Sequence, residues 1–219
     1  MKKLAVWLTW VSVCFCVWSI FAGCSARSPY QVAGENDWRA LFSENNLRNV
    51  TVRTAYPAKD GMDQTLEFIQ QTDAHVIRSE YRYPATFSVS VVSYDVVEDG
   101  FLVRYTQSVE TQEWTRRVSG EACDAWEEEL LKSLGFEEYR ELYSELVWDE
   151  TENCYRYRNE ETGEDLRFRV ENGKLLSVIG KQKVAEISGA PVQMDMEITL
   201  SDYGKNRITL PAEIQRQLS

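Results

Sequence analysis

The stretch that decides the fold is residues 155–183, which read YRYRNEETGEDLRFRVENGKLLSVIGKQK. Apolar residues alternate with arginines and acids over this stretch. The alternating apolar positions are Tyr155, Tyr157, Leu166, Phe168 and Val170. A side-chain period of two is typical of a strand with one buried and one solvated face. Asn172-Gly173 follows, and this pair favours a two-residue type I′ turn. The stretch therefore predicts antiparallel strands joined by tight hairpins.

The same alternation appears on both sides of this stretch. Upstream, the alternating positions are Val50, Val52, Thr54, Phe87, Val89, Val91, Val103 and Tyr105; downstream, they are Met194, Met196, Ile198 and Leu200. Glu98-Asp99-Gly100 separates two such runs and predicts another hairpin, because glycine adopts positive φ readily. Residues 208–210 predict a last short strand before Pro211. In all, we expect about ten strands.

Two segments have helical spacing instead. Near the start of the folded part, Asn36 is placed to cap a short helix that buries Trp38, Leu41 and Phe42. In mid-chain, one apolar stripe comprises Cys123, Trp126, Leu130 and Leu134, and a second comprises Phe136, Tyr139, Leu142, Tyr143 and Leu146. Gly135 lies between the stripes and is suited to end the first helix.

These patterns together predict an α+β fold. A sheet of about ten strands twists and curls. We therefore expect a long curved antiparallel sheet, an open half-barrel, with the two-helix insert packed on its concave face. The predicted single domain covers residues 36–219. A short stretch over residues 24–35, mixed in Ser, Pro, Gly and Ala, is expected to tether it.

The first 24 residues resemble the signal and lipobox of a bacterial lipoprotein. Two lysines precede an uncharged apolar run over residues 4–22, and the motif Phe21-Ala22-Gly23-Cys24 puts small residues directly before a cysteine. In that family a lipid is attached to the cysteine thiol and the chain is cut before it. The resemblance implies a signal peptide over residues 1–23 and a mature chain that begins at acylated Cys24.

An uncleaved membrane anchor and an ordinary cleaved signal are the alternatives to this lipoprotein. The run over residues 4–22 is long enough to span a bilayer, and Phe21 stands where leucine is usual. The lipoprotein and the anchor agree on topology, since the lysines remain cytoplasmic and later residues face away. We therefore expect an extracytoplasmic protein anchored to a bacterial cell membrane.

The charge balance argues against nucleic-acid binding. The formal net charge is −11, and loss of residues 1–23 with their two lysines makes it −13. Binding to nucleic acid depends on Lys and Arg neutralising phosphates, which an acidic domain opposes. Solubility is a sufficient explanation for such a surface. The expected partners are the membrane, an amphiphile or an envelope protein, and no cofactor is expected.

The order of elements gives a second resemblance. A lipid-anchored chain with a long antiparallel sheet and a helical insert is similar to half-barrel carriers typified by lipoprotein-localisation proteins and mycobacterial glycolipid-binding lipoproteins. The local likeness is the ending ITLSDYG over residues 198–204, followed by ITLP over residues 208–211. In those families a cavity between sheet and helices holds acyl chains, so the resemblance implies a carrier of amphiphiles.

The function we expect from the sequence is non-enzymatic binding of a lipid or other amphiphile in such a cavity. The residues expected to line it are Phe87, Val89, Val91, Trp126, Leu130, Leu166, Phe168, Met194 and Met196. The same residues also suit a filled core, since burying a large apolar side chain stabilises a fold by about 1.5 to 3 kcal/mol. An envelope protein-interaction module with a filled core is therefore the alternative.

An envelope hydrolase is a third reading, which the sequence supports least. His75 is the only histidine and lies in a strand-like run without a nucleophile elbow. The densest acids are Glu160, Glu161, Glu164 and Asp165, in an exposed turn where we expect no pKa shift. We expect no metal site, because Asp149, Glu150 and Glu152 lack the pattern of a calcium loop. Cys123 and Cys154 are the pair that a disulfide would join; two separate thiols are the alternative.

Overall fold

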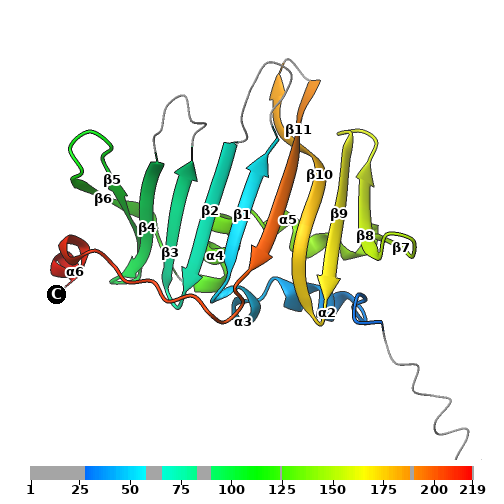
Figure 1. The fold of residues 1–219 in the computed structure, drawn as a ribbon, viewed down its shortest axis with the longest axis horizontal. Coiled ribbons are helices and arrows are strands. Elements are labelled where there is room, and N and C mark those ends of the chain that lie inside the picture. The colour runs from blue at the N-terminus through cyan, green and yellow to red at the C-terminus, as the bar shows by residue number, and fades with distance from the viewer. Residues whose placement is uncertain (1–27, 58–65, 83–89, 124, 188–189, 219) are drawn as a thin grey trace, which may run out of the picture.

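The structure, a computed structural model, describes residues 28–57, 66–82, 90–123, 125–187 and 190–218. In this part of the chain the strands form a single open antiparallel sheet of 11 strands, accompanied by a few helices (Figure 1). The predicted long antiparallel sheet is thereby confirmed.

The elements follow one another in the order that the alternating and helical patterns predict. The strands are β1 (Thr51–Tyr56), β2 (Leu66–Asp73), β3 (Val76–Arg82), β4 (Ser90–Glu98), β5 (Phe101–Gln107), β6 (Trp114–Ala122), β7 (Val147–Asp149), β8 (Cys154–Asn159), β9 (Glu164–Glu171), β10 (Lys174–Ile187) and β11 (Ala190–Ser201). The helices are α2 (Glu35–Leu41), α3 (Glu44–Leu47), α4 (Trp126–Leu134), α5 (Glu137–Glu141), the 3₁₀ turn η1 (Leu142–Glu145) and α6 (Ala212–Leu218).

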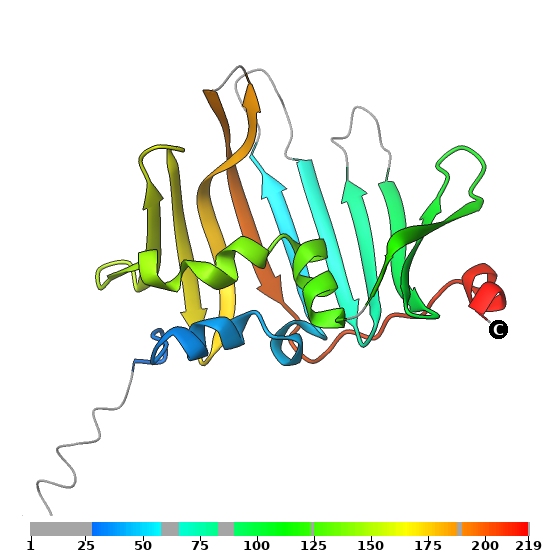
Figure 2. The same ribbon diagram turned by 180° about the vertical axis from the view of Figure 1, so that it is seen from behind.

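The sheet is built from two meanders that meet in its middle. β1 to β6 run outward from the centre, and α4, α5 and η1 then carry the chain across to β7 at the other edge. β7 to β11 return to the centre, where β11 pairs with β1 from Thr51 opposite Ser201 to Ala55 opposite Glu197. Figure 2 shows that α2, α4 and α5 lie on one side of the sheet, which we call the helix side.

The two hairpins predicted from short turn signals are confirmed. Asp99 and Gly100 join β4 to β5 with φ of 49° and 80°. Asn172 and Gly173 join β9 to β10 with φ of 52° and 70°. Positive φ at both central residues is the requirement of a type I′ turn, whose twist matches that of the flanking strands.

The main core lies on the helix side. The ring of Trp38, fully buried in α2, packs edge-on against Phe168 of β9 with 5.4 Å between ring centroids. The indole Nε1 of Trp38 donates a hydrogen bond of 3.0 Å to the carbonyl oxygen of Tyr139 in α5. The buried core members from the helices and the turn after α4 are Trp38, Leu41, Phe42, Leu47, Trp126, Leu130, Leu131, Leu134, Phe136 and Tyr139. One aromatic residue thus joins two helices to the sheet.

A second, smaller core lies on the opposite side of the sheet. Ile214 of α6 is fully buried there, together with Tyr94, Val96, Val103 and Tyr105 of β4 and β5. These strand residues alternate with positions that face the helix side, so they face away from it. Figure 1 shows the C-terminal segment running along the sheet to reach this end. β4 is therefore covered on both of its faces.

Several expectations about helices are wrong in detail. Asn36 is inside α2, whose N-cap residue is Gly34 with no side-chain cap. Cys123 precedes α4, and its backbone N–H donates to the carbonyl oxygen of Gly100. The second apolar stripe forms only the five-residue α5 and then η1. Gly135 does end α4, with φ of 72°.

Two strand assignments are also wrong. Residues 208–210 form no strand but lead into α6, and half-buried Ile208 and Leu210 pack on the second core. His75 is in the turn between β2 and β3, where Ala74 takes a φ of 47°. That turn lacks the glycine or asparagine that usually reveals a hairpin in a sequence, so β2 and β3 read as one run.

The folded part reaches back into the stretch assigned to the tether. The carbonyl oxygen of Pro29 accepts a hydrogen bond of 2.8 Å from the N–H of Asn172. The N–H of Val32 donates to the hydroxyl of Tyr155 at 2.9 Å. Residues 24–27 lie outside the described residues.

Gly180 provides a test of how closely β9 and β10 approach. Its φ is 148°, and a Cβ at this position would lie 1.9 Å from the carbonyl oxygen of Asp165. We expect Gly180→Ala to lower the free energy of unfolding by about 2 to 5 kcal/mol, through overpacking and backbone strain. Urea unfolding measures this. Gly34→Ala, with extended backbone and open space around it, is the control and should cost under about 1 kcal/mol.

Candidate functional site

Most of the residues predicted to line a cavity are packed as core. Trp126, Leu130, Leu166, Phe168 and Met196 share the main core and are at most 8% exposed. Val91 and Met194 are half-buried and do not belong to that cluster. Phe87 and Val89 lie outside the described residues. Beneath α2, α4 and α5, therefore, these side chains fill the space between helices and sheet.

Further along the sheet, the helix side carries a group of partly exposed apolar residues. We call this group the aromatic patch: Tyr56, Leu66, Phe68, Tyr81 and Val91. The strand register places Tyr56 opposite Leu66, Phe68 opposite Tyr81, and Tyr81 opposite Val91. Alternation from core residues Val52 and Ile77 shows that all five face the helix side.

A stacked pair of rings forms the centre of the aromatic patch. Phe68 and Tyr81 are 4.1 Å apart between centroids and inclined by only 21°. Tyr81 nevertheless remains 41% exposed, which is unusual for a large ring packed on a sheet. Burial, and then the nearby Tyr81, raise the pKa of the Tyr56 hydroxyl. These residues thus offer apolar surface beside a polar phenol.

The helix side becomes polar as β2 to β5 run away from the aromatic patch. One row below Phe68 and Tyr81, the register aligns Gln70, Ser79, Ser93 and Thr106. Gln70 donates a hydrogen bond of 2.8 Å to the carbonyl oxygen of Ser133 near the end of α4. In the next row, Asp95 is 1% exposed and accepts two hydrogen bonds from Arg104.

Sequence reasoning missed Phe68 and Tyr81. Alternation was available in Leu66, Phe68 and Gln70, and again in Ile77, Ser79 and Tyr81. The hidden turn at Ala74 concealed that these are two strands in register. A stacked pair across two strands can be recognised only once that register is known.

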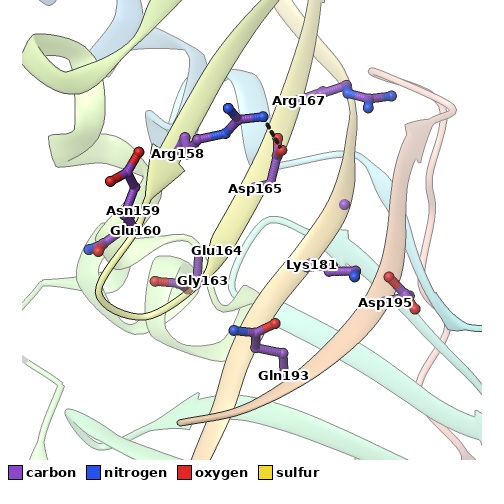
Figure 3. A pocket seen from close by; sticks show the side chains of 11 residues that line it. Arg158, Asn159, Glu160, Gly163, Glu164, Asp165, Arg167, Lys181, Gln193 and Asp195 are labelled. Atoms are coloured by element: carbon purple, nitrogen blue, oxygen red, sulfur yellow. Dashed lines mark hydrogen bonds and ion pairs between the residues drawn. The ribbon is translucent and has the colours of Figure 1, made fainter.

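A polar cleft lies at the far end of the sheet, against β8 to β11 (Figure 3). Its volume is about 450 Å³, and it is lined by Arg158, Asn159, Glu160, Gly163, Glu164, Asp165, Arg167, Gly180, Lys181, Gln193 and Asp195. The acids that the sequence singled out therefore gather here, with the exception of Glu161. They are mixed with cations from the neighbouring strands.

Asp165 contradicts the expectation that nothing in this turn shifts a pKa. Arg156 donates to both carboxylate oxygens, at 3.0 and 2.7 Å, and Arg158 donates at 2.9 Å. These hydrogen bonds, chiefly that from Arg156, lower the pKa of Asp165 from 3.8 to about 2. A carboxyl group held ionised in this way is unsuited to act as a general acid near neutral pH.

The remaining reactive side chains are scattered. Exposed His75 stacks edge-on against Trp126, with 5.4 Å between ring centroids. Asp149 accepts hydrogen bonds from the N–H groups of Thr151 and Glu152, as in an ordinary turn. Within the described ranges, no group of three or more His, Cys, Asp or Glu side chains could hold a metal ion.

Cys123 and Cys154 are not joined by a disulfide. Cys123 is tied to Gly100 at the β4–β5 hairpin, whereas Cys154 begins β8 near the other edge. With neighbouring strands about 4.8 Å apart, the intervening strands hold the two thiols much farther apart than a disulfide allows. The alternative of two separate thiols fits this arrangement.

Comparison with known proteins found no matching protein family, curated protein or solved structure. Among the described residues, there is no helix with the length and apolar character needed to cross a membrane.

The ion pairs of Asp165 predict a pH-dependent stability. Its pKa is lowered on folding, so its contribution is present above the unfolded value near 4 and is lost as the pH falls toward 2. We expect Asp165→Asn to cost about 1 kcal/mol at pH 7, after allowance for solvent screening, and almost nothing at pH 2. Urea unfolding at several pH values measures this. Asp195→Asn, an exposed carboxylate in the same cleft, should show a much smaller pH dependence.

Proposed function

We propose that this chain is an extracytoplasmic, non-enzymatic lipoprotein that binds an amphiphile on the helix side of its sheet. The signal resemblance supports acylation of Cys24 after removal of residues 1–23. In this proposal the sheet is a curved half-barrel, and α4 and α5 lie on its concave face. The ligand occupies the part of that face that the helices leave open.

The observation that carries the binding proposal is the stacked pair of Phe68 and Tyr81. A monomeric domain usually buries such rings or leaves them scattered. Here one ring is 41% exposed and is flanked by half-buried Leu66 and Val91 on the same face. Concave apolar surface with a few polar groups at its margin is the usual character of a small-molecule site.

The position of the N-terminal segment supports an anchored domain. Residues 29–32 are hydrogen-bonded to the sheet, so only four peptide links separate Cys24 from Ser28. Four residues span at most about 14 Å. An acyl anchor at Cys24 would therefore hold the domain against the membrane surface, where an amphiphile need not cross much water.

We expect Phe68→Ala combined with Tyr81→Ala to weaken binding of a fluorescent acyl probe by about tenfold or more, because two ring surfaces are lost. The protein is residues 28–219, which contain both core clusters entire. A fluorescence titration measures the affinity. Phe101→Ala removes a ring of similar exposure from the opposite side and should change little. Equal losses in both variants would contradict the assigned site.

Acylation is tested by metabolic labelling with a fatty-acid analogue. The wild-type chain should incorporate the label, and Cys24→Ala should not, because the thiol is the proposed attachment point. Mass spectrometry of the labelled chain should also show the loss of residues 1–23. Labelling of both proteins, or of neither, would refute the proposed attachment.

The filled core beneath the helices favours a second candidate function. A domain whose Leu130, Leu131 and Phe168 are fully buried has no room for a ligand at that place. Such a domain would instead bind an envelope protein through its surface. If purified wild-type protein carried no extractable amphiphile and did not bind the acyl probe, this interaction module would replace the carrier.

A further inference from the structure

Two arginines face each other across neighbouring strands near the free edge of the sheet. The register places Arg104 of β5 directly opposite Arg117 of β6. Their neighbours Val103 and Tyr105 are buried in the second core on the opposite side, so both arginines project to the helix side. Like charges at directly opposed positions destabilise a sheet unless something neutralises them.

One carboxylate is available for these two guanidinium groups. Asp95, on the other side of Arg104, accepts hydrogen bonds from its Nε at 2.6 Å and its Nη2 at 2.9 Å. This two-point contact fixes the guanidinium of Arg104 in position. Within the part of the chain that the structure describes, Arg117 makes no ion pair. One positive charge therefore stays uncompensated at this point of an acidic protein.

A hollow lies over these groups. Its volume is about 270 Å³, and its lining consists of Asp95, Leu102, Arg104, Arg117, Val118 and Ser119. In the adjacent row on the same side, Thr106 of β5 lies opposite Thr115 of β6. The hollow thus combines two cations with nearby hydroxyl groups, which are the donors that a phosphate or carboxylate requires.

We propose that Arg104 and Arg117 bind an anionic group, a phosphate or carboxylate, of the amphiphile held at the aromatic patch. This inference rests on the proposed function, since it identifies the headgroup end of the same ligand. The Arg104 row lies four residues along the strands from the Tyr81 row, which is about 13 Å. Hydroxyl groups of Ser79, Ser93 and Thr106 lie between the two.

The polar cleft of Figure 3 is less suited to an anion, although it is larger. Three cations line it, and four carboxylates accompany them. Asp165 already occupies Arg158, so an added anion there would meet net negative charge. The hollow at Arg117 has the reverse balance, with two cations and one carboxylate.

The test uses the full chain in nanodiscs of uncharged, phosphate-free digalactosyl diacylglycerol, with empty nanodiscs as the blank. Isothermal titration calorimetry measures three probes: octyl phosphate, octyl glucoside and inorganic phosphate. We expect octyl phosphate to bind at least about tenfold more tightly than octyl glucoside. Arg117→Gln should weaken octyl phosphate about tenfold and leave octyl glucoside unchanged, whereas Arg117→Lys should retain part of the preference.

Arg169→Gln is the matched control, because it removes an exposed arginine from the opposite side of the sheet. It should leave all three affinities unchanged. Equal affinity of the wild type for octyl phosphate and octyl glucoside would overturn the headgroup site and leave the amphiphile proposal standing. An equal loss of both probes in Arg117→Gln would also overturn it, since that indicates structural damage.

The remaining outcomes separate the two proposals. If neither octyl probe bound but inorganic phosphate bound in an Arg117-dependent way, the anion site would stand as a site for free phosphate and the carrier function would fall. If octyl phosphate bound far more tightly than inorganic phosphate, the anion belongs to a lipid headgroup. Absence of binding by all three probes would refute the anion site.

Discussion

The antiparallel pairing of β1 with β11 is the contact on which the rest of the structure depends. It joins residues 51–55 to residues 197–201, so nearly the whole folded chain lies between the partners. All other strand pairs connect neighbours in sequence. Closing so long a loop costs conformational entropy, which the hydrogen bonds and the helix-side core must repay. Without this pair, two separate meanders would each expose an edge.

The sheet buries its apolar face on different sides in its two halves. Over β8 to β11 and β1, apolar residues face the helices. Over β4 and β5, they face the other way and are covered by α6 and the segment before it. This reversal leaves the helix side of β3 to β6 free for aromatic, hydroxyl and charged groups. The proposed ligand surface exists because the C-terminal segment satisfies the burial requirement from behind.

Local signals predicted the elements that depend on local physics. Asp99-Gly100 and Asn172-Gly173 indicated their hairpins, because few residues accept positive φ. Gly135 indicated the end of α4 for the same reason. The turn at Ala74 and His75 had no such residue and was missed. The candidate site fared worse, since apolar residues expected to line a cavity, such as Leu130 and Phe168, are packed as core.

Sequence alone determined which residues share a face of each strand, where most turns fall, and where α4 ends. Those features follow from a side-chain period of two and from the few residues that adopt positive φ. Only the tertiary structure decided what covers each face. Whether Phe168 meets Trp38, or Tyr81 meets solvent beside Phe68, depends on contacts between segments distant in the chain. Alternation specifies a face, but it carries no information about the partner that packs on it.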